Sequence, residues 1–390
     1  MLLFLLAAQI ILLRVQTTTA QEVNSIKIGA WGDDASRENS GVGVELRTHI
    51  YDSYPGSFDY YWVGNNLADG SFIQFGYGIE PGLICLKGSR SFGKFSCSGT
   101  SAFMADDDAR WQWQYWPNRE GTDFYFEIGP AYSAGANATW HNYTVISSSN
   151  RTWNFYFDDK LVSSFNVPAT LSVDPAYIVA EQTADQNSST RLEPVEFMNL
   201  SYFGHESWHQ VDSLVAVSLC SGSESCSAGG YGIAALGMNH VIAGSGLPSA
   251  LDGTLLWTSG YVRLTVDSAG GSSFYVNSLG EQREFEDSAT VSVPKGMFAY
   301  VSLSDTSLPD LGILGLLGGS EHFDSWTGDI QSSNASLRML MESDISIQGR
   351  WTEDIMIPVL FLVILCAVSS AMVLFWLRRR QHVPRVIIRQ

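Results

Sequence analysis

The sequence predicts an all-β exterior followed by a single membrane-spanning helix, and three observations support this fold class. Short runs that alternate apolar and polar residues recur every ~8 to 15 residues, with turn residues between them. Amphipathic helical periodicity is scarce in the same region. Near the C-terminus, residues 355–377 form an uncharged apolar run that is long enough to cross a bilayer as a helix.

The two ends of the chain predict its topology. The opening run "MLLFLLAAQIILL" is typical of a secretory signal, and small residues precede a cleavage position after Ala20, so residues 1–20 are expected to be a signal peptide. The tail 378–390 carries five Arg and no acidic residue, and basic flanks stay in the cytoplasm. The sequence therefore predicts a single-pass type I protein of the cell membrane, with its N-terminal region outside.

The charge balance excludes nucleic acid as a partner. Five of the 22 Lys and Arg residues lie in the tail, so residues 1–377 carry 17 basic and 40 acidic side chains. Such an exterior repels a phosphate backbone. The expected partners are the lipid bilayer and an extracellular glycan or surface protein.

Cysteines and glycosylation sequons agree with export. Cys85 lies close to Cys97 and Cys220 lies close to Cys226, which predicts two hairpins that are each closed by a disulfide. No cysteine or histidine cluster has zinc spacing, so no metal site or cofactor is expected from this pattern. Six Asn-x-Ser/Thr sequons are candidate glycosylation sites: Asn137, Asn142, Asn150, Asn187, Asn199 and Asn334.

The exterior is long enough for two or three domains. In "WNFYFDDKLVSSF" the Asp158-Asp159 pair predicts a tight hairpin. A second strand pattern starts near residue 258, and residues 205–257 are expected to be a connecting β segment that belongs to the membrane-proximal unit. The apolar run "LGILGLLGGS" at 311–320 packs on its own domain in one interpretation and touches lipid or a partner in the other.

Two stretches resemble known families. The stretch "GANATWHNYTVISSSNRTWNFYFDDKLVSSF" resembles the concanavalin A-like lectin and glucanase jelly-roll family, which implies a β-sandwich over residues 21–204. That fold serves lectins, glycosidases and peptidases alike. Residues 258–354 resemble a small β repeat module of prokaryotic surface proteins, which implies a spacer domain. The residues that carry this second resemblance are Phe323, Trp326, Gly328, Asp329 and Trp351.

Two patterns for hydrolytic chemistry are present but weak. The HExxH motif of zinc peptidases occurs at residues 205–209, but it needs a helix, and here strand-like runs flank it on both sides. We therefore interpret it as a polar connection. For a glycosidase, Asp123 and Glu127 share a strand face but lie four residues apart, roughly 13 Å, which is too far for the usual carboxylate pair.

A third resemblance concerns the glutamic peptidases, which are also concanavalin-like sandwiches. The runs "WVG", "FIQFGY", "RWQWQYWP" and "AYIVAE" are similar to strands of that family. The resemblance implies that Gln74 donates to a tetrahedral oxyanion and that Glu181 is the base. A membrane-anchored hydrolase using this pair is the alternative function.

The aromatic content favours a ligand-binding head without chemistry. Aromatic side chains with polar neighbours hold sugars on this fold, and the candidates are Trp113, Trp116, Trp140, Tyr125 and Glu127. Trp140 shares a strand face with the sequon residue Asn142, so we expect this face to be accessible. The acidic run at residues 106–108 is either a solvated loop or a Ca²⁺ ligand set. The preferred function is recognition of a glycan or another surface component.

Overall fold

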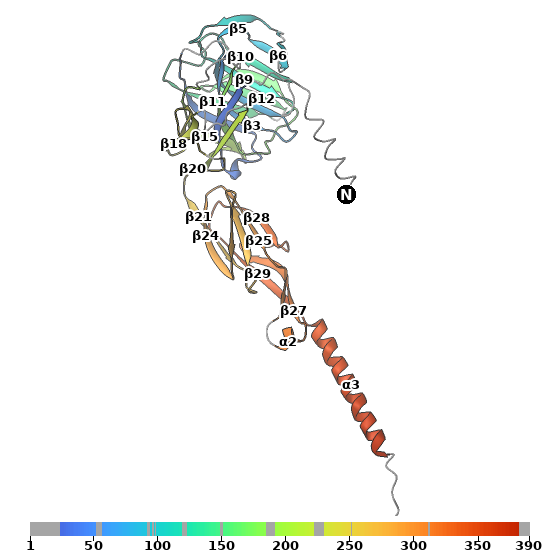
Figure 1. Cartoon of the computed structure of the whole chain (residues 1–390). Coiled ribbons are helices and arrows are strands. Elements are labelled where there is room, and N and C mark those ends of the chain that lie inside the picture. The colour runs from blue at the N-terminus through green and yellow to red at the C-terminus, as the bar shows by residue number, and fades with distance from the viewer. Residues whose placement is uncertain are drawn as a thin grey trace, which may run out of the picture. The chain divides into compact units, whose positions relative to one another are not determined.

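In the computed structural model, the chain forms two compact units (Figure 1). The first unit comprises Met1–Gly260 with Pro294–Gly296, and the second comprises Tyr261–Val293 with Met297–Gln390. The residues that the structure describes are 24–51, 57–91, 94–95, 97, 99–118, 123–148, 151–184, 192–221, 230–250, 252–310 and 313–381. The expected signal peptide lies outside the described residues.

The first unit is a sandwich of a ten-stranded and an eight-stranded antiparallel sheet, which confirms the all-β fold class. The large sheet has the order β20 (Leu255–Thr258), β17 (Ser213–Ser221), β1 (Asn24–Trp31), β14 (Tyr177–Ala184), β3 (Ser57–Asn66), β4 (Phe72–Ile79), β9 (Arg110–Trp116), β10 (Asp123–Ile128), β6 (Lys87–Ser91) and β7 (Lys94–Phe95). The small sheet has the order β13 (Lys160–Asn166), β12 (Thr152–Phe157), β11 (Trp140–Ser147), β2 (Gly41–Arg47), β15 (Val195–Gly204), β19 (His240–Ser245) and β18 (Tyr231–Gly237), with β16 (Ser207–Gln210) paired to β15.

Strand alternation explains how the two sheets share one core. Val42, Val44 and Leu46 of β2 are fully buried, whereas the residues between them are Gly43 and Glu45. Phe75 of β4 packs edge-on against Phe155 and Tyr143 of the opposite sheet. The hairpin predicted at Asp158-Asp159 is present, and both residues have the positive φ that a tight type I′ turn requires.

The segment 205–257 is a correction to the expected domain organisation. It is not a connection within the membrane-proximal unit, because β17 pairs with β1 along its length and β19 pairs with β15. Its side chains Leu214, Ile233 and Val241 belong to the sandwich core. The sandwich therefore extends to Gly260, beyond the predicted boundary at residue 204.

One of the two predicted disulfides is confirmed. Cys85 is bonded to Cys97, and this bridge closes most of the segment that connects β5 (Gly82–Cys85) to its partner strand β8 (Ser101–Met104). The predicted bond from Cys220 to Cys226 lies outside the described residues.

The second unit contains a five-stranded and a four-stranded sheet. The five-stranded sheet has the order β24 (Ser288–Pro294), β21 (Tyr261–Asp267), β29 (Ile345–Asp354), β27 (Ser320–Gly328) and β26 (Ser307–Pro309). The four-stranded sheet has the order β23 (Glu281–Phe285), β22 (Phe274–Ser278), β25 (Phe298–Leu303) and β28 (Ser336–Leu340). Phe323 contacts both Trp326 and Trp351, and Trp326 is fully buried, so these aromatic residues form part of the core of the unit.

The C-terminal helix α3 (Met356–Gln381) matches the predicted span in position. Its stretch Met356–Arg378 is long and apolar enough to cross a membrane by length and composition.

Candidate functional site

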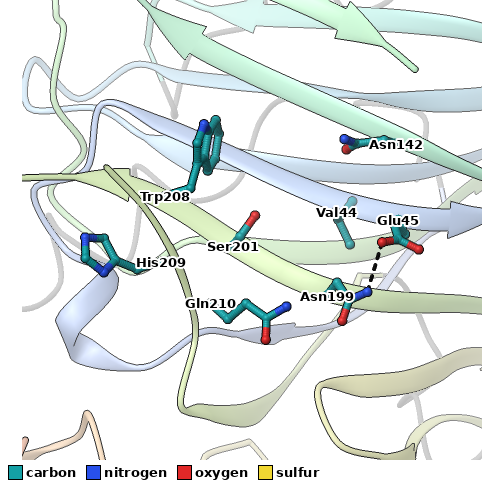
Figure 2. A pocket seen from close by; sticks show the side chains of 8 residues that line it. All are labelled: Val44, Glu45, Asn142, Asn199, Ser201, Trp208, His209 and Gln210. Atoms are coloured by element: carbon teal, nitrogen blue, oxygen red, sulfur yellow. Dashed lines mark hydrogen bonds between the residues drawn. The ribbon is translucent and has the colours of Figure 1, made fainter. Parts of the chain in front are cut away.

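A polar depression lies on the outer face of the small sheet, and we call it the Trp208 groove. Its volume is about 270 Å³, and a second depression of about 550 Å³ shares Asn142, Ser201 and Trp208 with it. Together the two are lined by Val44, Glu45, Asn142, Thr144, Ile146, Tyr156, Asp159, Asn199, Ser201, Trp208, His209 and Gln210. Figure 2 shows how Trp208, Ser201 and Asn142 approach the groove from different segments.

Gly43 lies against three side chains that line the groove. A Cβ atom at Gly43 would lie 3.1 Å from the Thr144 Oγ1 atom, 3.3 Å from the Ser201 Oγ atom and 3.6 Å from the Trp208 ring. Because Gly43 has no side chain, the hydroxyls of two neighbouring strands and the edge of an indole can pack closely over its backbone. In the "GVGVE" run of β2, the valine side chains therefore point into the core, and the glycines and the glutamate lie on the outer face.

Trp208 reaches this position because the HExxH residues form a hairpin. His205 and Glu206 both have positive φ and make the turn from β15 into β16, and Trp208 then pairs with Phe203 across the hairpin. The two rings pack edge-on, and Trp208 remains 44% exposed. The motif lies on strands instead of a helix, and no group of three metal-ligating side chains occurs among the described residues.

Polar contacts fix the walls of the groove. The Asn199 Nδ2 atom donates to the Glu45 Oε1 atom at 2.9 Å, as the dashed line in Figure 2 marks. The Thr144 hydroxyl donates to the Asn142 Oδ1 atom at 3.1 Å. These bonds hold amide and carboxylate groups in fixed positions beside the indole.

An ion-pair network lies beyond the groove on the same sheet face. Glu196 accepts hydrogen bonds from Arg47 and His240, and His240 packs edge-on against Trp140. Burial opposes ionisation of Glu196, but the hydrogen bonds and charges of Arg47 and His240 outweigh it and lower the pKa of this carboxyl group. Trp140 is thus half-buried in a structural network outside the groove.

The predicted catalytic pair is not brought together. Gln74 and Glu181 lie on the same face of the large sheet, but Gln74 is opposite Gly64, which is opposite Tyr177. Glu181 is four residues further along β14, so the two are separated by about 13 Å along the strand and about 10 Å across it. Because one water cannot bridge that gap, the expected Gln and Glu catalytic pair is wrong for this arrangement.

Each member of that pair has a local partner. The Gln74 Nε2 atom donates to the Gln114 Oε1 atom at 3.1 Å, and Gln74 is buried. Glu181 forms an ion pair with Lys27 at 2.9 Å. The other described carboxylate on this sheet face near the amides is Glu80, which accepts a hydrogen bond from Tyr60. Burial raises the pKa of Glu80, and the Tyr60 hydroxyl and the Arg90 charge oppose that shift.

The five predicted ligand-binding residues do not form one site. Trp113, Tyr125 and Glu127 are neighbours on β9 and β10, whereas Trp116 and Trp140 lie elsewhere. Trp113 is buried in the core and donates to the Ser163 hydroxyl, so its predicted binding role is wrong. Trp116 stacks between Phe72 and Phe124 on the other face of the large sheet. Tyr125 and Glu127 lie at β10, where Glu127 pairs with Lys87 and accepts from Ser163. Trp140 lies near the groove but not in it, as described above.

Among the described residues, the acidic run at 106–108 is not part of any group of three metal-ligating side chains. Asp108 is buried, forms an ion pair with Arg110 and accepts a hydrogen bond from the Tyr132 amide. The Asp108 carboxylate therefore stabilises the local structure through contacts with Arg110 and Tyr132.

The sequons differ in their surroundings. Asn142 and Asn199 both line the groove, and Asn137 and Asn334 are exposed. Asn150 and Asn187 lie outside the described residues. The sequence pattern does not reveal the groove directly, because Trp208 lies inside the HExxH motif. The signals that identify it are the strand runs on both sides of that motif and the glycine alternation in β2.

Comparison with known proteins gives a limited result. No family model matches the chain, and no curated protein matches it. Among solved structures, scytalido-glutamic peptidase with a peptide-based transition state analog is 14% identical and covers 57% of this chain and 98% of its own, with a TM-score of 0.32. A peptidase of the eqolisin family bound to a tripeptide is 11% identical, with the same coverage and TM-score.

A Bacteroides ovatus family 16 endo-glucanase is 9% identical and covers 43% of this chain and 70% of its own, with a TM-score of 0.24. At TM-scores below 0.5 these likenesses carry no information on the activity of this chain.

Proposed function

We propose that this protein is a single-pass surface protein whose sandwich binds a saccharide in the Trp208 groove. The observation that carries the proposal is the half-exposed Trp208 indole beside fixed amide, hydroxyl and carboxylate groups. An exposed aromatic face stacks on the C–H groups of a sugar ring, and the polar groups around it select the hydroxyls.

The anchor is the second part of this proposal. Helix α3 is almost entirely exposed in the structure, and an exposed apolar helix of this length needs a lipid environment. Arg378, Arg379 and Arg380 follow the apolar stretch directly, which supports a cytoplasmic C-terminus. The head then faces the outside, where saccharides of the cell's own or a neighbouring surface are available.

Binding of the full chain in nanodiscs to a saccharide array tests the proposal. We expect Trp208→Ala to weaken binding at least tenfold, about 1.4 kcal/mol, because the stacking surface is lost. Gly43→Val is expected to weaken binding similarly, because its side chain would push the Thr144 and Ser201 hydroxyls out of their positions beside the groove. Trp140→Ala is the matched control, since it removes an indole from the same sheet face outside the groove.

Two outcomes would contradict the proposal. The first is that no saccharide binds the unmodified chain. The second is that Trp208→Ala binds as the unmodified chain does while Trp140→Ala does not, which would move the site to the Arg47, Glu196 and His240 network. Thermal unfolding of each variant shows whether a loss of binding is a loss of fold.

A further inference from the structure

The apolar loop at residues 311–319, which precedes β27, has large apolar side chains that are exposed to solvent. Its described part begins with the short helix α2 (Ile313–Leu316), in which Ile313 is 76% exposed and Leu316 is 87% exposed. The interpretation that this run packs on its own domain is therefore wrong for these two side chains. Exposed apolar groups of this size in one short segment indicate an interaction surface.

Backbone hydrogen bonds within the loop fix the positions of these two exposed side chains. The Leu317 amide donates to the Ile313 carbonyl, and the Gly319 amide donates to the Leu314 carbonyl at 2.8 Å. A Cβ atom at Gly315 would lie 1.8 Å from the Asp310 carbonyl oxygen, so only glycine permits this turn. The side chains of Ile313 and Leu316 are thus presented by a defined backbone.

Strand register places the loop beside the start of the apolar helix. Ser320, the first residue after the loop, pairs with Asp354 of β29, and α3 begins two residues later at Met356. A Cβ atom at Gly318 would lie 2.9 Å from the Ile357 Cγ2 atom. Met356 is 78% exposed and Ile357 is 60% exposed, so exposed apolar side chains of the first turn of α3 lie next to the end of the loop.

We infer that this loop inserts into the outer leaflet of the membrane that α3 spans. The inference rests on the membrane anchor under Proposed function, and it adds a second contact between the membrane-proximal unit and lipid. Residues 311–319 carry no charged side chain, so the segment fits the boundary between headgroups and acyl chains. Continuity with the spanning helix favours lipid as the occupant over a partner protein.

Photocrosslinking of the full chain in phosphatidylcholine nanodiscs tests the inference. A photoreactive p-benzoylphenylalanine is introduced as Leu316→p-benzoylphenylalanine, and adducts are identified by mass. The same substitution at Phe361, in α3, is the control for the span. The same substitution at the exposed Ser288, in β24, is the control for an aqueous position.

We expect phospholipid adducts at positions 316 and 361 and none at position 288. A lipid adduct at 361 without one at 316 overturns the loop inference and leaves the anchor intact, whereas no lipid adduct at 361 overturns the anchor itself. Adducts from position 316 to a second copy of the chain also overturn the inference. As a further check, Ile313→Asp should abolish the lipid adduct at 316 and leave the thermal unfolding temperature unchanged, because Ile313 makes little packing contact.

Discussion

At the scale of single residues, the fold strongly alters the ionisation of the Asp33 carboxyl group. It precedes a short 3-10 helix, η1 (Asp34–Ser36), and accepts hydrogen bonds from the Ser36 and Asp212 amides. Burial raises its pKa from 3.8 to about 7, and these amide hydrogen bonds oppose the shift in part. The folded protein therefore binds a proton at Asp33 more tightly than the unfolded chain does.

This shift makes stability depend on pH in a stated direction. Between pH 3.8 and about 7 the folded state holds a proton that the unfolded state has lost, so the free energy of unfolding falls as pH rises. The slope from this group is at most about 1.4 kcal/mol per pH unit. Asp33→Asn cannot titrate, so denaturant unfolding at pH 5 and pH 7.5 should show a smaller difference for this variant than for the unmodified chain. An unchanged difference would contradict the assigned shift.

At the scale of elements, the HExxH sequence at His205-Glu206 forms a β-hairpin and not the helix that zinc binding by this motif requires. Both residues occupy a left-handed conformation that Asn-Gly adopts at lower cost. We expect His205→Asn with Glu206→Gly to stabilise the chain by about 0.5–1 kcal/mol and to leave saccharide binding intact. Denaturant unfolding and the array measure the two effects. A loss of binding in this variant, together with a loss of binding when the unmodified chain is treated with a metal chelator, would show that HExxH has a metal-dependent role.

Elements that follow local rules could be predicted from the sequence, and those that need a distant partner could not. The Asp158-Asp159 hairpin, the Cys85 to Cys97 bridge and the apolar helix follow from short-range patterns. The pairing of β17 with β1 joins residues about 190 positions apart, and no local pattern specifies it. The same limit applies to the site, because the groove exists only where β2, β11 and β15 lie side by side.

At the scale of the whole molecule, the boundary of the head decides which fragment folds. Ending the chain at residue 204 leaves β1 without β17 and β15 without β19. It also removes Leu214, Ile233 and Val241 from the core, at roughly 1.5–3 kcal/mol for each buried side chain. That loss is comparable with the whole stability of an ordinary domain, about 5–15 kcal/mol.

We therefore expect fragment 21–260 to be soluble and to unfold cooperatively, and fragment 21–204 to aggregate or to lack a cooperative transition. Circular dichroism during thermal unfolding, with size-exclusion chromatography, distinguishes the two. A cooperative transition in fragment 21–204 would mean that residues 205–257 are an addition to a complete sandwich. If only fragment 21–260 folds, the groove depends on the longer boundary, because Trp208 and Gln210 lie beyond residue 204 and reach the site through the strand that pairs with β15.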